Sequence, residues 1–472
     1  MLASKYKYFL ASFILVMTFL FGLLKGPVVP DEIQSKNCAR NVKLPLNLGL
    51  TLNCDSGIYL RLASNLNLLF EDTRIVNGRS LTPGNVEQST PGSSIIVWII
   101  SKPIIEIWKN FQFYTENTVK NVKYSLNTVY SQLNLEQTVD DSFNDFSNLI
   151  PVYIAYILFN SLILIFCILL YLRTLKIKFI DIKPAYAVCF LISTIIIIND
   201  VNKQFFYSPG PQIFRILCPV LTVFITSKIL KSSNLTKDLF IGSFIFGLMM
   251  LFYYIFFVSF LTLIFTYFLL ELRKDTNIFD LKKIKNNFVC IILFILPSLL
   301  WFLICYKIND SVLIADMSHD GFGLFILVNQ YIAHGIFGSF IFFLDSIVRT
   351  FYHSLIHSWF IVILMVIVFF HVRKIMNSYQ RDLFKVCFFF FLSAILFFSF
   401  YSPSTSRMVF SSFLVFIPFI GEISKLSFNI SKFKSLIFPV YFIFFSFYTI
   451  HTIVKKEPYG WYDEKGSYYF VR

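Results

Sequence analysis

Residues 150–172 read IPVYIAYILFNSLILIFCILLYL, an apolar run without a charged residue. A run of this length can cross the hydrocarbon core of a bilayer as an α-helix, which takes about 20 residues. Arg173, Lys176 and Lys178 follow directly, as is typical of the cytoplasmic end of a transmembrane helix. The stretch therefore predicts a membrane span that ends on the cytoplasmic side.

The composition of the whole chain agrees with a membrane protein. Hydrophobic residues make up 56% of the 472 residues and charged residues only 14%, which excludes an ordinary soluble globular protein. The apolar runs are long, whereas the strands of a membrane β-barrel alternate polar and apolar residues over short segments. We therefore expect an all-α, polytopic membrane protein.

The apolar segments predict about 11 transmembrane helices. They are residues 8–24, 150–172, 184–200, 211–229, 239–254, 255–271, 287–306, 356–372, 383–400, 408–422 and 434–453. The first segment has no small-residue cleavage site after it, so we interpret it as an uncleaved signal anchor. Segments 239–254 and 255–271 could also form one long tilted helix.

The basic residues predict the orientation of these helices. They gather in the short gaps 173–183, 228–237, 273–285, 373–385 and 425–434. With the N-terminus in the cytoplasm, all of these gaps fall on the cytoplasmic side, as the positive-inside rule requires. The net charge of +14 is then explained by membrane topology rather than by nucleic-acid binding.

Two further apolar segments are not counted as spans: 95–108 is placed at the outer membrane interface, and 323–343 is interpreted as an outer interfacial or re-entrant segment. If either crossed the membrane, every later gap would be inverted and the alternation of charge would be lost. Residues 25–149 then form one large extracytoplasmic first loop with interfacial helices. A helical bundle over 150–453 and a tail over 454–472 complete a single multi-pass membrane domain, 1–472.

The first outer loop contains the sequence Asp55-Ser-Gly-Ile-Tyr59, followed by Arg61. Asp55 precedes an amphipathic helical pattern, so its carboxylate could cap that helix by accepting backbone N–H bonds. A carboxylate held at the membrane rim could instead act as a general base. Cys38 and Cys54 of the same loop could form a disulfide if the loop faces an oxidising compartment.

A second outer gap combines aromatic residues with a rigid Pro-Gly-Pro turn. It reads Phe205-Phe206-Tyr207-Ser-Pro-Gly-Pro-Gln212-Ile-Phe-Arg215. The aromatic residues could form an interfacial belt, or they could line a wall for a sugar or a prenyl chain, with Gln212 and Arg215 as donors. An arginine near the start of a span is costly unless it is paired or contacts a phosphate.

The last outer gap ends in Arg407, at the start of an apolar span. Its guanidinium could bind a phosphate through two hydrogen bonds, or the side chain could extend to the lipid headgroups. Asp316, His319 and Asp320 could bind a divalent cation, but a solvated acidic loop explains them more simply. We therefore predict no metal site and no cofactor.

These features resemble the GT-C superfamily of integral-membrane glycosyltransferases, which take sugars from polyprenyl-phosphate carriers. The layout is similar: one span, a long outer loop with an acidic residue near its start, and then many short spans. The local pattern Asp55-x-x-x-Tyr59-x-x-x-Ala63 carries the resemblance, with Arg79 and Pro83 before the next membrane contact. The late Arg407, which leads into an apolar helix, also resembles the pattern of such enzymes.

The resemblance implies an inverting sugar transfer on the outer face of the plasma (inner) membrane. Asp55 would deprotonate an acceptor hydroxyl, which attacks the anomeric carbon of the lipid-linked sugar. Superfamily members often carry an Asp-Glu signature in this loop, and Asp31-Glu32 could be that signature and supply the base instead. The partners implied are a polyprenyl-phosphate-linked sugar and a glycan, lipid or protein acceptor.

The substrate-binding residues implied are Tyr59, Arg61, Arg79, Tyr207, Gln212, Arg215 and Arg407. Among them, Arg79, Arg215 and Arg407 would hold the leaving phosphate, whose developing charge they would stabilise.

Two other functions fit parts of the pattern. A polysaccharide polymerase or ligase would also use outer-face arginines, but its main outer loop usually lies late in the chain, whereas here it comes first. A transporter or flippase of lipid-linked oligosaccharides would be expected to show internal repeats and charged residues at mid-membrane. The predicted spans carry almost no charged residue, which favours the transferase.

Overall fold

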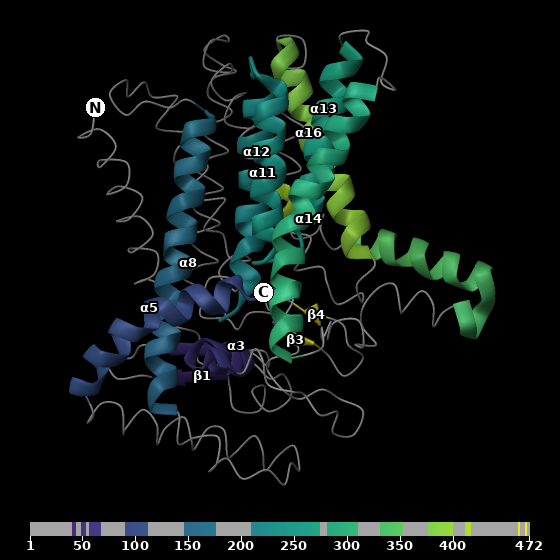
Figure 1. Ribbon diagram of the computed structural model, residues 1–472. Helices are drawn as coiled ribbons and strands as arrows, with labels where there is room; N and C mark the ends of the chain where they lie inside the picture. The colour runs from purple at the N-terminus through teal and green to yellow at the C-terminus, as the bar shows by residue number, and fades with distance from the viewer. Residues whose placement is uncertain are drawn as a thin grey trace, which may run out of the picture.

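The protein is a bundle of long helices (Figure 1). The computed structural model describes residues 40–43, 49–52, 56–67, 90–111, 146–175, 209–273, 281–309, 331–352, 376–399, 411–416, 461–462 and 468–469. Nearly all of these residues are helical, so the prediction of a helical membrane protein is confirmed in its coarse form. Two short antiparallel strand pairs were not anticipated: β1 (Arg40–Lys43) with β2 (Gly49–Leu52), and β3 (Trp461–Tyr462) with β4 (Tyr468–Tyr469).

Six predicted spans are helices in the structure. They are α8 (Phe146–Thr174), α11 (Phe214–Leu230), α12 (Leu235–Met250), α13 (Phe256–Arg273), α14 (Leu281–Asn309) and α16 (Ser378–Ser399). The other predicted spans, 8–24, 184–200, 356–372, 408–422 and 434–453, lie wholly or mostly outside the described residues. The number of about 11 therefore stays a prediction.

Length and composition single out six helices of the described part as able to cross a membrane. They are Pro151–Thr174, Pro211–Leu230, Phe256–Arg273, Lys283–Ile308, Tyr331–Tyr352 and Ser378–Ser399. The set differs from the predicted spans in two ways. It leaves out α12, which has only 16 residues, and it includes Tyr331–Tyr352, which overlaps the predicted interfacial segment 323–343.

The apolar stretch 239–271 forms two helices rather than one long one. The chain leaves α12 at Met250, makes a tight turn over residues 251–255, and enters α13 at Phe256. Within the turn, the N–H groups of Leu251 and Phe252 donate to the carbonyl oxygens of Leu248 and Met249 at 3.1 and 3.0 Å. These bonds satisfy carbonyl groups that the end of α12 would otherwise leave without partners.

The described residues of four basic gaps lie at one end of the bundle, the upper end in Figure 1, here called the basic end. Ion pairs join the helices there: Lys228 Nζ lies 2.8 Å from Asp238, and Arg273 pairs with Asp382. The ammonium of Lys231 lies 3.7 Å from the ring centroid of Tyr379. The ends of α11, α13 and α16 are thereby held together.

Two carboxylates at the basic end, those of Asp238 and Glu271, have cationic partners. Hydrogen bonds from Lys228 and Ser232 hold the pKa of the Asp238 carboxyl below its usual range. Glu271 and Lys283 form a 2.9 Å ion pair whose side chains are only 9% and 11% exposed. Removing one partner of a pair this buried would leave an uncompensated charge, so this pair fixes how α13 meets α14.

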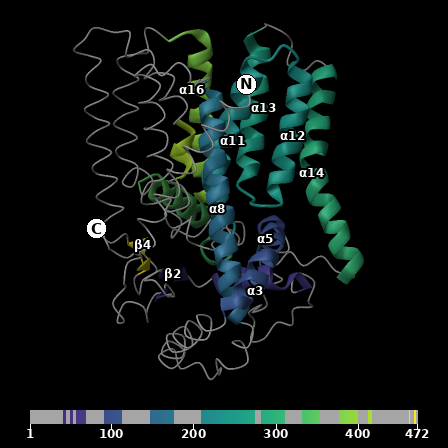
Figure 2. The ribbon, with the colours of Figure 1, turned by 90° about the vertical axis from the view of Figure 1, so that its left-hand side faces the viewer.

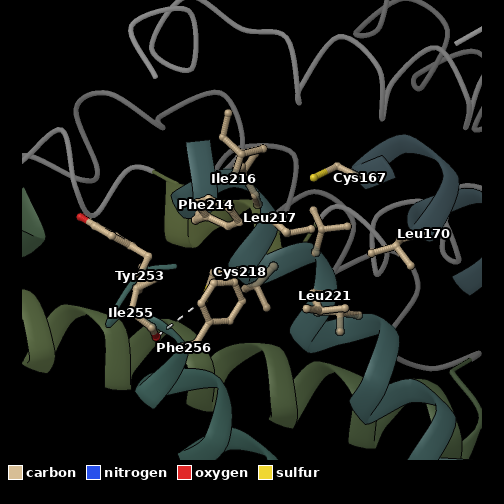
Figure 3. Packing of buried hydrophobic residues seen from close by; sticks show 14 of the residues in the cluster. Cys167, Leu170, Phe214, Ile216, Leu217, Cys218, Leu221, Tyr253, Ile255 and Phe256 are labelled. Carbon is tan, nitrogen blue, oxygen red and sulfur yellow. Dashed lines mark hydrogen bonds between the residues drawn. The ribbon is translucent and has the colours of Figure 1, made fainter. Parts of the chain in front are cut away.

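Helix α11 lies at the centre of the bundle, because 14 of its 17 residues are buried. Figure 3 shows its residues Phe214, Leu217 and Leu221 packed among side chains of α8 and of the turn before α13. Small polar groups join α11 to α13. Thr222 Oγ1 donates to Ser259 Oγ at 2.7 Å, and the thiol of Cys218 lies 3.0 Å from the same oxygen. Such hydroxyl contacts hold helices together where lipid gives no hydrophobic driving force between them.

Two helices lie crosswise to the bundle. Helix α5 (Gly92–Trp108) runs obliquely across the lower part of α8, and the helix Tyr331–Tyr352 projects sideways from the bundle, mostly exposed (Figure 1). Figure 2 shows α5 and α3 (Ser56–Ser64) below the lower ends of α12 and α13. This orientation is the one expected of helices that lie along a membrane surface.

Gly247 allows α12 and α14 to approach closely, because a Cβ there would overlap the backbone carbonyl of Phe294. We expect Gly247→Ala to destabilise the protein by about 1–3 kcal/mol, since backbone cannot move aside as a side chain can. Unfolding in detergent is measured with a thiol-reactive dye, which reports exposure of the buried cysteines Cys167, Cys218 and Cys387.

The matched control is Gly242→Ala, on the same helix. A Cβ at Gly242 would meet the side-chain tips of Ile225 and Leu263 at 3.0 and 3.2 Å, which can shift. Equal melting temperatures for the two variants would contradict the close approach of α12 and α14.

The two ends of the bundle are expected on opposite sides of the membrane. In a Cys38→Ser, Cys54→Ser background, we introduce Asn65→Cys beside α3 and Lys237→Cys at the basic end, both exposed positions. A membrane-impermeant maleimide should label Asn65→Cys in cells with an intact plasma membrane, and Lys237→Cys only after permeabilisation. The reverse pattern would place the α3 end in the cytoplasm.

Candidate functional site

Polar residues from separate parts of the chain meet at the end of the bundle opposite the basic end. Four elements come together there: α3, the start of α5, the 3-10 helix η4 (Pro211–Ile213) that leads into α11, and the turn 251–255. These four elements form what is here called the α3 end, the lower end of the bundle in Figures 1 and 2. The candidate functional site lies at this end.

Helix α3 is held against the start of α11 by a contact between Tyr59 and Gly210. Tyr59 is only 6% exposed, and a Cβ added to Gly210 would lie 2.8 Å from its ring. Gly210 has φ 132° and ψ −177°, a conformation that is essentially open to glycine alone. The hydroxyl of Tyr156 donates to the carbonyl oxygen of Tyr59 at 3.4 Å. The segments predicted to form the first and second outer regions thus meet at a backbone position that requires glycine.

Arg215 is the charged residue at the centre of the α3 end. It lies in the first turn of α11 and is 1% exposed. Its Nε donates to the hydroxyl of Tyr253 at 2.6 Å, and its guanidinium carbon lies 5.2 Å from the centroid of the Tyr253 ring. Burial of a guanidinium is tolerated only with polar partners of this kind.

Tyr253 extends the polar surroundings of Arg215. Its hydroxyl lies 3.5 Å from that of Tyr254, and the two ring centroids are 4.5 Å apart. Figure 3 shows the Tyr253 hydroxyl pointing away from the cluster around Phe214 and Phe256, so the turn divides a polar side from an apolar one.

The start of α5 is tied to the same turn. The N–H of Gly92 donates to the carbonyl oxygen of Leu251 at 2.9 Å, and a Cβ at Gly92 would touch the ring of Phe252. The hydroxyl oxygens of Ser93 and Ser94 are buried with no hydrogen-bond partner among the described residues. Gln212, in η4, likewise has a buried side-chain oxygen without a described partner.

Three of the predicted site residues are brought to the α3 end: Tyr59, Gln212 and Arg215. Arg61 lies two residues beyond Tyr59 in α3. The remaining predicted site residues, Asp31, Glu32, Asp55, Arg79, Tyr207 and Arg407, lie outside the described residues. Helix α3 begins at Ser56, so Asp55 directly precedes it in the chain, the position that the capping hypothesis requires.

Sequence reasoning missed Tyr253, Ser93 and Ser94. Tyr253 lies within an aromatic, apolar stretch, and only the paired tyrosines at 253 and 254 could have indicated a turn. The serines follow Thr90, Pro91 and Gly92, which is a recognisable helix start. Their burial depends on tertiary packing and has no local signal.

No group of three His, Cys, Asp or Glu side chains that could hold a metal ion occurs within the described ranges. The acidic stretch with Asp316, His319 and Asp320 lies outside those ranges.

The chain matches no protein-family model, and neither the curated proteins nor the solved structures include a significant match to it. The chemistry of the α3 end is therefore argued from its own residues. A buried guanidinium with an adjacent tyrosine hydroxyl is suited to binding an anion, above all a phosphate.

Gly210→Ala should separate α3 from the start of α11. The new methyl group would overlap the Tyr59 ring, and alanine would have to adopt the positive φ of Gly210. We expect a loss of about 2–4 kcal/mol, as strain and overpacking add. The measurement is the melting temperature in detergent.

Gly335→Ala is the control, because Gly335 also has a positive φ, 68°, but a Cβ there would meet nothing within 4 Å. Replacing Tyr59 with leucine in the Gly210→Ala background should recover part of the lost stability. If Gly210→Ala were no worse than Gly335→Ala, the contact between the two outer segments would be refuted.

Proposed function

We propose that the protein is a membrane glycosyltransferase of the GT-C type. It transfers a sugar from a polyprenyl-phosphate carrier to an acceptor on the outer face of the plasma membrane. The observation that supports this proposal is the meeting of Tyr59 with the segment that leads into Arg215. The two predicted substrate-binding segments share one end of the bundle, opposite the basic end.

Arg215 is the proposed ligand of the carrier phosphate. Its guanidinium is enclosed by protein, where the effective dielectric constant is low and charge interactions are stronger than in water. Negative charge develops on the phosphate oxygen as the bond to the sugar breaks, and a fixed positive charge stabilises that change. The bond to Tyr253 orients the guanidinium before substrate binds.

Asp55 is the proposed general base, with Asp31 or Glu32 as the alternative. Asp55 immediately precedes α3, and Tyr59 one turn later packs on Gly210. A base must be positioned within hydrogen-bond reach of the proton that it removes, and a helix anchored by a buried tyrosine provides a rigid support.

The proposed reaction is a single displacement with inversion. The base takes the proton of an acceptor hydroxyl, and the hydroxyl oxygen forms a bond to the anomeric carbon. The bond between that carbon and the phosphate oxygen breaks, and the electron pair leaves with the polyprenyl phosphate. Arg79 and Arg407 are proposed to join Arg215 on the phosphate. Arg61, Tyr207 and Gln212 are proposed to orient the sugar.

Transfer from a radiolabelled polyprenyl-phosphate sugar by the purified protein tests the proposal. Asp55→Asn should lower kcat by about 10²–10⁴-fold if Asp55 is the base, because the amide cannot accept the proton. Asp31→Asn should then have little effect, and the reverse result would make Asp31 the base. Asp345→Asn is the matched control, since Asp345 is half-exposed and pairs with Arg349 on the helix Tyr331–Tyr352.

Unchanged transfer in both Asp55→Asn and Asp31→Asn would eliminate the assigned bases. Translocation of a lipid-linked oligosaccharide across proteoliposomes without any transfer would favour the flippase alternative. Joining of two lipid-linked glycans would favour the polymerase or ligase.

A further inference from the structure

We propose that the first turn of α5, with the hydroxyl groups of Ser93 and Ser94, forms a second half of the phosphate site beside Arg215. The ligand class is a phosphomonoester. Its identity as the polyprenyl phosphate of the carrier rests on the proposed function, whereas the anion site itself rests on the contacts described below.

The first observation is the unusual state of the two serines. Both residues are fully buried, and neither hydroxyl has a hydrogen-bond partner among the described residues. Other buried helical serines of this protein bond to backbone carbonyls: Ser101 donates to Trp98 at 2.9 Å and Ser243 to Leu239 at 2.9 Å. A buried hydroxyl without a partner is unfavourable, and two at adjacent positions call for a ligand that accepts from both.

The second observation is the helix end on which these serines lie. Helix α5 has 17 residues, and its N-cap residue, Pro91, makes no side-chain capping bond. The N-terminus of a helix carries a partial positive charge and N–H groups without intrahelical partners, which together favour an anion. The serine hydroxyls are therefore placed where a bound anion is stabilised.

The third observation is that one turn, residues 251–253, connects this helix end with Arg215. Leu251 accepts from the N–H of Gly92, Phe252 touches Gly92, and Tyr253 accepts from Arg215. The start of α5 and the buried guanidinium thus contact three consecutive residues of one turn. An anion bridging them would be held by donors from both α5 and α11.

The donor set fits a phosphomonoester better than a carboxylate. The proposed site offers hydrogen-bond donors from two hydroxyl groups, a helix end and a guanidinium. A carboxylate has only two oxygens to accept from them, whereas a terminal phosphate has three. The phosphate could belong to a polyprenyl chain, to a bilayer lipid headgroup or to free inorganic phosphate.

The test compares binding of polyprenyl monophosphate and of the matching polyprenol to the full-length protein in nanodiscs. Inorganic phosphate and phosphatidylglycerol are added as competitors to identify the source of the phosphate. The wild type should prefer the phosphorylated lipid. The Ser93→Ala, Ser94→Ala double variant should bind polyprenyl monophosphate about tenfold more weakly, because it loses two hydroxyl groups that donate hydrogen bonds to the charged phosphate. It should bind the polyprenol as well as the wild type does, because the polyprenol has no phosphate.

Ser101→Ala is the matched control, because it removes a buried hydroxyl from the same helix, two turns away, and should leave both affinities unchanged. Ser93→Thr and Ser94→Thr keep the hydroxyl groups and should keep the preference for phosphate. If the double variant does not fold, the two single alanine variants are compared with these threonine variants.

An unchanged affinity of a folded alanine variant for polyprenyl monophosphate would overturn the inference, while wild-type sugar transfer would leave the proposed function standing. Weakened phosphate binding in that variant, together with a wild type that transfers no sugar, would support the anion site and refute the transferase. A wild type with equal affinity for the phosphate and the polyprenol would overturn both.

Discussion

A positive charge enclosed among hydrophobic helices determines how the α3 end is built. Arg215 is almost completely buried, so its guanidinium needs polar partners that lipid cannot supply. Tyr253 is one such partner, and it is available because the chain turns between α12 and α13 instead of continuing as one helix. The same turn receives the start of α5 through Leu251. Burial of this one side chain therefore links the geometry of three helices.

The two ends of the bundle use charge in different ways. At the basic end, carboxylates balance the cations: Asp382 pairs with Arg273, and Glu271 pairs with Lys283. At the α3 end, Arg215 is met by a phenolic hydroxyl, which is a neutral acceptor. Ion pairs of this kind hold helices in place. The bond from Arg215 to Tyr253 orients the guanidinium that is proposed to bind the carrier phosphate.

The sequence predicted the helical bundle and the grouping of the basic gaps, because the length of an apolar run and the position of lysines are local properties. It predicted two spans at 239–254 and 255–271 but left one long tilted helix open, since Phe252, Tyr253 and Tyr254 are as apolar as the helices beside them. Arg215 was recognisable from the cost of a charge in a span. The contact of Tyr59 with Gly210 and the burial of Ser93 were not recognisable, because they arise only when distant segments pack together.

The central claim is that the α3 end binds the phosphate of a lipid carrier. A cryo-EM structure of the protein in nanodiscs with bound polyprenyl monophosphate tests it most directly. The account predicts phosphate density within hydrogen-bond distance of Arg215, with the prenyl chain running into the bilayer. Phosphate density at the basic end, or anywhere away from Arg215, would contradict it.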